Sequence, residues 1–391
     1  MELPIYFKPV EEFCLLDELW YDGGRLGAKI SIHSAEGRFP DLEGIDIALI
    51  GVYEDRGSLA NFGCADAPDW VRKFLYRLYQ GSWQAKIADL GNIRSGDRLE
   101  DTYFALRNVI AYLLRSNIVP VIIGGSQDLT YANYLAYESM GKIINIVSVD
   151  NQFDLGSEPG VLNSQSYLSS IIMHQPNFLF NFTNIGYQTY FVEHEAAELM
   201  KKLYFDAYRL GLVQSDIEEV EPMVRNADLL SVDLSSARQS DAPGNANATP
   251  NGFYGEELCR IMRYAGLSDK LTSLGLYEVN PRYDSNGQTA HLAAQMIWYF
   301  VDGYYNRKMD FPMQDKSEYI KYHVSLKDLE DQIVFYKSRK SDRWWMEVPC
   351  PTSLMSKYER HYLVPCSYKD YETAAAGEVP DRWWQAYQKI M

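Results

Sequence analysis

Residues 118–128 of this chain read IVPVIIGGSQD, and residues 143–154 read IINIVSVDNQFD. Each stretch begins with a nearly continuous apolar run of strand length and ends in a cluster of small and polar residues. Strands that are covered on both faces of a sheet read in this way, and such strands are typical of parallel sheets between two layers of helices. The two stretches therefore indicate an α/β protein with a buried parallel sheet.

Further apolar runs flank these two, and helical patterns separate them. Strands that alternate with helices favour a parallel sheet with helices on both faces, so we expect a three-layer α/β/α fold. The predicted strands are eight in number, at residues 45–52, 86–90, 118–124, 143–150, 178–186, 210–214, 229–234 and 271–279. The predicted helices include residues 67–80, 99–115, 193–208, 256–265 and 288–304.

The composition excludes several classes of partner and compartment. The net charge of −16 argues against nucleic acid as a partner. No run of 18 uncharged apolar residues occurs, so we expect no membrane insertion. The N-terminal residues do not have the order of a signal peptide. The five cysteines form no C-x-x-C pair, and their odd number argues against a disulfide framework, so we expect a cytoplasmic protein.

The charge and the aromatic residues are distributed unevenly along the chain. Residues 306–391 carry a net charge of +1 and residues 1–305 a net charge of −17. Four of the eight tryptophans also lie in residues 306–391. The sequence therefore predicts a lead-in at residues 1–40, a core domain at residues 41–305, and an aromatic-rich C-terminal extension at residues 306–391 that packs on or beside the core.

Four of the predicted strands end in clusters of polar residues. The clusters are Gly124–Asp128, Asp150–Asp154, Asp233–Ser235 and Glu278–Asp284. Ligands of open parallel sheets bind at the carboxyl ends of the strands, so we expect these clusters to meet in one crevice. The alternative for each cluster alone is a helix cap or a turn, for which Asp and Asn are common.

The order and spacing of the four clusters resemble the ureohydrolase family, which includes arginase, agmatinase and formimidoylglutamase. The family motifs are G-G-D-H-S, D-A-H-x-D, S-x-D-x-D and E-x-N-P-x-x-D, and the resemblance covers about residues 45–305. The formimidoylglutamase-like branch is the nearest. The resemblance implies an arginase-like fold with an eight-stranded parallel sheet, and two Mn²⁺ ions that convert a bridging water into hydroxide.

The family holds its two ions with two histidines and four aspartates, and this chain matches three of those six positions. Asp150, Asp154 and Asp233 match aspartates. Gln127 and Gln152 stand where the family has histidine, and Ser235 stands where it has the fourth aspartate.

Amide and hydroxyl oxygens are weaker ligands for Mn²⁺ than imidazole and carboxylate. In the family, one ion uses the first histidine with the positions of Asp150, Asp154 and Asp233, and that site loses only its histidine. The other ion loses both of its private ligands, at Gln152 and Ser235. We therefore expect no metal, or at most one weak divalent cation, Mg²⁺, Ca²⁺ or Mn²⁺, with Gln127 in place of the histidine.

Two further residues are candidates for this site. Three crowded aspartates need a neutralising partner, which is a bound cation, protonation of one carboxyl, or Arg238. Glu278 matches the family's carboxylate that receives the guanidinium or amidine group of the substrate, so it is a candidate ligand-binding residue. The alternative is that Glu278 and the following residues serve only the turn that Pro281 fixes.

The C-terminal extension contains the sequence Asp-Arg-Trp-Trp twice. The candidate interaction residues are Arg343, Trp344, Trp345, Arg382, Trp383 and Trp384. Arginine and tryptophan are enriched in interface hot spots, so the pattern predicts a protein partner or self-association. The alternative is that the extension wraps the core and packs its own aromatic side chains there.

Three functions remain open from the sequence. The substituted ligands favour a non-catalytic binding or scaffold protein, a pseudoenzyme of this family that has lost the dinuclear manganese site. The first alternative is a metal-dependent hydrolase of linear amidines, similar to formimidoylglutamase or agmatinase, with an altered or single-metal site. The second alternative is a sensor of a small ligand.

Overall fold

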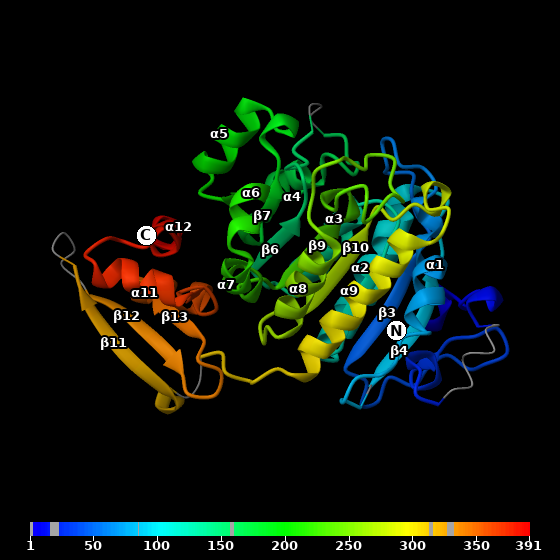
Figure 1. The fold of residues 1–391 in the computed structure, drawn as a ribbon, viewed down its shortest axis with the longest axis horizontal. Helices are drawn as coiled ribbons and strands as arrows, with labels where there is room; N and C mark the ends of the chain where they lie inside the picture. Colours follow the sequence, from blue (N-terminus) through cyan, green and yellow to red (C-terminus); the bar gives the residue numbers. More distant parts are fainter. Residues whose placement is uncertain (1–2, 16–22, 85, 157–159, 313–315, 327–331) are drawn as a thin grey trace.

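The computed structural model describes residues 3–15, 23–84, 86–156, 160–312, 316–326 and 332–391, and it is built around one large sheet (Figure 1). The strand order is β1-β4-β3-β5-β10-β9-β6-β7-β8, with β2 beside β4. β1 is antiparallel to β4, and the other pairs are parallel. The strands are β1 (Phe7–Lys8), β2 (Ser31–Ile32), β3 (Ile47–Val52), β4 (Ile87–Ile93), β5 (Val119–Ile123), β6 (Ile144–Val149), β7 (Leu179–Tyr187), β8 (Asp206–Arg209), β9 (Leu229–Asp233) and β10 (Ser273–Tyr277).

Helices cover both faces of this sheet, which gives three layers. Alternate strand residues point to opposite faces, so Leu49 belongs to the core that contains residues of α1, α7, α8 and α9, and Ile50 to the core that contains residues of α2 and α3. These helices are α1 (Ala67–Leu75), α2 (Leu99–Arg115), α3 (Leu129–Glu138), α7 (Val220–Arg225), α8 (Gly255–Gly266) and α9 (Gln288–Tyr305). The remaining helices beside the sheet are α4 (Tyr167–Met173), α5 (His194–Lys202) and α6 (Leu210–Ser215). The arginase-like three-layer fold predicted from the sequence is confirmed.

The strand count and two element boundaries differ from the prediction. The sheet has ten strands instead of eight, because β1 and β2 of the lead-in add to its β4 side. The predicted strand at residues 210–214 is wrong, since this segment is the helix α6. The predicted helix at residues 193–208 is too long, because α5 ends at Lys202 and β8 follows. Periodicity alone does not separate a short apolar strand from a short helix, which explains the error at residues 210–214.

The C-terminal extension forms a separate antiparallel sheet of four strands, in the order β11-β12-β13-β14. The strands are β11 (Tyr319–Ser325), β12 (Gln332–Ser338), β13 (Trp344–Glu347) and β14 (Leu363–Cys366). The helices α10 (Met355–Tyr358), α11 (Tyr368–Ala375) and α12 (Asp381–Ile390) accompany this sheet (Figure 1). β12 and β13 form an antiparallel hairpin. The division of the chain into three domains at residues 40 and 305 stays a prediction.

The aromatic side chains of the extension pack mainly against one another. Trp344 stacks on Tyr371 and also contacts Tyr322. Trp344, Trp345 and Trp383 are buried, whereas Trp384 is 45% exposed. The predicted protein partner therefore remains a prediction, and among these four tryptophans Trp384 is the one that offers it an exposed ring.

Arginine side chains join the extension to the core. Arg225 of α7 donates to the carbonyl oxygens of Trp344 and Cys366, each at 3.1 Å, and its guanidinium lies 4.4 Å from the ring centre of Trp345. From the extension, Arg343 pairs with Glu221 at 3.3 Å and Arg382 pairs with Glu219 at 2.9 Å. Both candidate interaction arginines are thus engaged within the chain. In the described parts of the chain, no helix is long and apolar enough to span a membrane.

A second contact between the core and the C-terminal extension lies at the amino-terminal ends of β9 and β10. The buried Lys270 donates from Nζ to Asn226 Oδ1 at 2.9 Å and to the carbonyl of Arg360 at 3.1 Å. Asp228 lies 4.0 Å from Lys270 and 2.5 Å from the Arg360 guanidinium. Burial lowers the pKa of Lys270 to about 7, Asp228 opposes this shift, and the neighbouring Arg360 and Lys142 add to it.

We expect Lys270 to make the stability of the protein depend on pH. Its pKa is about 7 in the folded chain and about 10.4 in an unfolded chain. Between these values the unfolded state binds more protons, so the free energy of unfolding rises with pH, by at most about 1.4 kcal/mol per pH unit. Lys270→Met removes this contribution. Urea unfolding of both proteins from pH 7 to pH 9 checks it, and parallel pH curves would show that Lys270 is not the titrating group.

Candidate active site

The four polar clusters lie at the carboxyl ends of four adjacent strands. β5, β10, β9 and β6 are neighbours in the sheet, in this order. Gln127 follows β5, Glu278 follows β10, Asp233 ends β9, and Asp150 and Asp154 follow β6. The predicted meeting of these clusters at one edge is confirmed, and all five side chains are buried.

Glu278 is held in place by donors from three other segments. Its Oε1 accepts from the backbone N–H of Gln127 at 2.9 Å, and its Oε2 accepts from Nδ2 of Asn61 at 2.8 Å. Asn245 also donates to the backbone carbonyl of Glu278 at 2.9 Å. Glu278 has a φ of 66° and Asp154 a φ of 50°, a backbone conformation that is costly for residues other than glycine and that clusters at functional sites.

The aspartates around Glu278 keep several oxygen atoms without a hydrogen bond. Asp150 Oδ1 accepts from the N–H of Gln152 at 3.0 Å, and Asp233 Oδ1 accepts from the N–H of Ser235 at 2.6 Å. Asp150 Oδ2, both carboxyl oxygens of Asp154 and Gln127 Oε1 are buried and have no partner among the described residues. Buried oxygens without partners are costly, so this group requires a proton or a cation.

The carboxyl groups of this cluster have raised pKa values because they are buried together. Burial, with the neighbouring Asp150, raises the pKa of Asp154 well above its usual range. Burial, with Asp150 and Glu278, does the same for Asp233. Burial also raises the pKa of Glu278 to about 7. Among the described residues no Lys, Arg or His forms an ion pair with these acids.

Arg238 does not neutralise the cluster. Its Nε donates to Asp241 at 2.9 Å, and its guanidinium lies 3.7 Å from the ring centre of Tyr254. Of the three neutralising partners that the sequence left open, a bound cation and protonation therefore remain.

The donor atoms that this cluster offers to a cation are all oxygens. The four oxygens without partners, from Gln127, Asp150 and Asp154, are the donor type that Mg²⁺ and Ca²⁺ prefer. In the described parts of the chain, no three His, Cys, Asp or Glu side chains are grouped so that they could hold a metal ion by themselves. The oxygens named above therefore count the amide of Gln127 as a donor beside the two aspartates. Gln152 and Ser235 stand at the two positions where the family has ligands of the second ion only. Gln152 is half-buried and Ser235 is buried.

A cavity of about 220 Å³ opens beside the cluster. Asp233, Glu278 and Ser235 contribute to its wall, together with neutral side chains and one aromatic ring. Its remaining lining residues are Asn151, Gln152, Ser164, Gln165, Phe191, Asn247 and Thr249. No histidine of the described residues lines this cavity. This volume suits a small polar ligand.

Several of these residues were missed in the sequence. Asn61, Phe191, Asn247 and Thr249 come from loops far from the four motifs, and their residue types carry no signal of their own. The stretch Gly244–Pro250, GNANATP, is rich in turn formers and marks the loop that brings Asn247 and Thr249 to the cavity.

Residues 45–302 match the sequence profile of the arginase family. The chain belongs to the arginase family. The formimidoylglutamase of Geobacillus thermodenitrificans is 28% identical over 295 residues, which cover 69% of this chain and 88% of that protein. The formimidoylglutamase of Streptococcus gordonii is 24% identical over 289 residues, which cover 66% of this chain and 85% of that protein. The resemblance to the formimidoylglutamase branch is confirmed.

Solved structures of the arginase family confirm the fold. Formiminoglutamase from Trypanosoma cruzi, solved with Mn²⁺, has a TM-score of 0.65 at 21% identity, and the match covers 72% of this chain and 99% of that one. Formimidoylglutamase from Bacillus subtilis has a TM-score of 0.66 at 19% identity, with 74% of this chain and 94% of that one covered. The profile match ends at residue 302, before the C-terminal extension begins.

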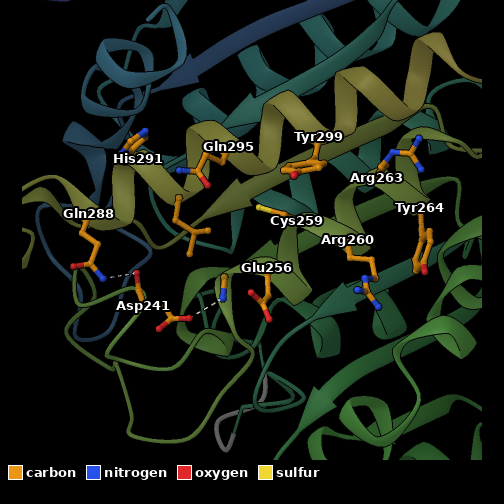
Figure 2. A pocket seen from close by; sticks show the side chains of 12 residues that line it. Asp241, Glu256, Cys259, Arg260, Arg263, Tyr264, Gln288, His291, Gln295 and Tyr299 are labelled. Atoms are coloured by element: carbon orange, nitrogen blue, oxygen red, sulfur yellow. Dashed lines mark hydrogen bonds between the residues drawn. The ribbon is translucent and has the colours of Figure 1, made fainter. Parts of the chain in front are cut away.

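A larger cavity, of about 760 Å³, is shown in Figure 2, and none of the carboxylates of the cluster lines it. It opens between α8 and α9, which approach each other closely at Gly266 and Gly303, where an added Cβ would lie 2.1 Å and 2.4 Å from backbone oxygens of the opposite helix. Because none of the family motifs reaches this cavity, we place the active site at the smaller cavity.

Proposed function

We propose that this protein hydrolyses a carbon–nitrogen bond of a linear amidine or guanidine, at a centre that holds one divalent cation through oxygen atoms. The observation that carries the proposal is the group of buried oxygens without partners, on Gln127, Asp150 and Asp154, next to Glu278 and the cavity. Relatives named formimidoylglutamase support hydrolysis over a purely structural role. This weighting reverses the preference for a non-catalytic protein that the substituted ligands suggested.

Each residue of the chain has a defined task in this proposal. Gln127, Asp150 and Asp154 would hold the cation, which lowers the pKa of water when bound. Glu278 is fixed by Asn61 and by the N–H of Gln127. It accepts hydrogen bonds from the N–H groups of the cationic amidine. The ligand's positive charge then favours the ionised form of Glu278, whose pKa is raised to about 7 mainly by burial.

In this proposal the carboxylate of Asp233 transfers the proton. Asp233 lines the cavity, and burial beside Asp150 and Glu278 raises its pKa. A carboxylate with a raised pKa can accept a proton from the attacking water and return it to the departing nitrogen. Water adds to the amidine carbon, the bond to the amine breaks, and the amine leaves with the proton.

A second candidate is a non-catalytic binding protein, either a scaffold or a sensor. The substitutions at Gln127, Gln152 and Ser235 favour it, since they remove both imidazoles and one carboxylate from the six positions of the family. Such a protein would keep Glu278 and the cavity for a cationic ligand without turning it over.

A product assay separates the two candidates. The purified protein is incubated with Mg²⁺, Ca²⁺ or Mn²⁺ and with N-formimidoyl-L-glutamate or agmatine, and formamide or urea is measured. We expect product from one of these pairs, and Asp150→Asn should lower turnover by at least about 100-fold, because it removes an oxygen of the cation set. If no combination of metal and substrate gives product while agmatine still raises the melting temperature, the protein is a non-catalytic binding protein.

A further inference from the structure

A cavity of about 470 Å³ lies beyond the wall of the active-site cavity, and no family motif lines it. Segments 187–190, 209–214 and 250–254 form most of its walls, together with Arg238. Segments 187–190 and 250–254 directly adjoin Phe191 and Thr249, which line the active-site cavity. Gln188 lies between the two cavities, because its N–H donates to the carbonyl of Asn151 at 2.9 Å and its Nε2 donates to the carbonyl of Asn251 at 3.2 Å. The two cavities are therefore neighbours that share a wall.

Two arginines line this second cavity, and each donates one hydrogen bond from Nε. Arg209 donates from Nε to the hydroxyl of Tyr187 at 3.1 Å. Arg238 donates from Nε to Asp241 at 2.9 Å, and its guanidinium carbon lies 3.7 Å from the ring centre of Tyr254. Within the described parts of the chain, no hydrogen bond or ion pair uses the Nη atoms of either arginine. One bond at Nε fixes each guanidinium and leaves its Nη donors for a ligand.

The other walls of the cavity are aromatic and apolar. Tyr187, Tyr190 and Tyr254 line it, and so do Leu210 and Leu212. Tyr190 is 65% exposed and Leu212 is 63% exposed, so these side chains still have apolar surface to cover. Aromatic rings in the wall favour a flat organic group, and guanidinium donors favour a carboxylate or phosphate.

The charges of this cavity are opposite to those of the active site. Asp233 and Glu278 line the active-site cavity, without an arginine, lysine or histidine among its described residues. The second cavity has two arginines and no acidic side chain among the described residues that line it. Asp241, which pairs with Arg238, balances one of the two positive charges. A ligand with one negative charge balances the other.

We propose that the cavity lined by Arg209 and Arg238 is a binding site for a small organic anion, a flat body with one carboxylate or phosphate group. The anion accepts hydrogen bonds from the Nη atoms of both guanidinium groups, and the flat body packs against the tyrosines. This site is separate from the amidine site and does not depend on the hydrolysis proposed above.

Isothermal titration calorimetry with matched probes tests the site on the full chain. Benzoate and phenyl phosphate carry the two candidate anionic groups on the same ring, and benzamide is the uncharged match. We expect one of the two anions to bind and benzamide to bind at least about tenfold more weakly, because it lacks the charge. The stronger of the two anions assigns the group as carboxylate or phosphate. Equal binding of benzamide, or no binding of either anion, would overturn the proposal.

Two variants locate the binding. Arg209→Gln should weaken the binding of the anion by at least about tenfold, since it removes one charged donor. Arg209 is exposed and its change leaves the core untouched, which circular dichroism verifies. The control is Arg260→Gln, an exposed arginine that lines the cavity between α8 and α9 (Figure 2) and should leave binding unchanged. Binding that survives Arg209→Gln, or that is lost in Arg260→Gln, refutes the assignment. Binding that persists in Glu278→Gln separates this site from the amidine site.

Discussion

Glu278→Gln is expected to weaken the binding of agmatine by about 2–5 kcal/mol, the loss seen when one partner of a buried charge pair is removed. In terms of Kd this is at least about 30-fold. The reason is that Glu278 is the buried carboxylate at the end of β10 that faces the cavity and is fixed by Gln127 and Asn61. Calorimetric titration of the wild-type protein and the variant with agmatine measures the difference.

Two controls give this result its meaning. Glu256→Gln changes an exposed carboxylate that lines the separate cavity between α8 and α9 (Figure 2), and it should leave the affinity unchanged. The melting temperature of Glu278→Gln should not fall, because the change removes one of four crowded acids that repel one another. If Glu278→Gln binds agmatine like the wild type, Glu278 does not bind the guanidinium group of agmatine. Its conformation then serves only the turn after β10.

Arg72→Met is expected to lower the free energy of unfolding by about 3–5 kcal/mol, the cost of leaving a buried charge without its partner. Arg72 of α1 is fully buried and donates to both carboxyl oxygens of Asp89, from Nε at 2.8 Å and from Nη2 at 2.9 Å. It also donates to Asn92 Oδ1 at 2.5 Å and to the carbonyl of Gly91 at 2.9 Å. One side chain thus fastens α1 to β4, and its loss leaves Asp89 charged and buried.

Urea unfolding measures this effect, and two comparisons identify its cause. Arg260→Met, at an exposed arginine, should change the free energy of unfolding by less than about 0.5 kcal/mol. The double variant Arg72→Met with Asp89→Leu should regain much of the loss, because an apolar pair of similar volume often replaces a buried ion pair without cost. A double variant as unstable as Arg72→Met alone would mean that packing, and not the unpaired charge, causes the loss.

The fold and the centre of the site were accessible from the sequence because their signals are local. Asp150 and Asp154 lie four residues apart at the end of one apolar run, and Asp233 and Glu278 each end another run, so the parallel sheet brings them together. Residues 210–214 were misassigned because five residues are too few to distinguish the helix α6 from a strand.

The rest of the site could not be predicted, because it depends on contacts between distant loops. Asn61 reaches Glu278 across 217 positions of the chain, and nothing around Asn61 marks it as a partner. Arg238 was a candidate partner for the aspartates from its distance along the chain, and the structure turns it to Asp241 and Tyr254 instead. Side-chain direction in a long loop follows from packing, which a single sequence does not display.

The number of metal ions per chain tests the central claim most directly. The protein is loaded separately with Mg²⁺, Ca²⁺ or Mn²⁺, dialysed, and analysed by mass spectrometry for metal content, with Asp150→Asn as the control that should hold none. We predict about one ion per chain, bound by the oxygens of Gln127, Asp150 and Asp154. Two ions per chain, or none with any of the three metals, would contradict a single-cation centre.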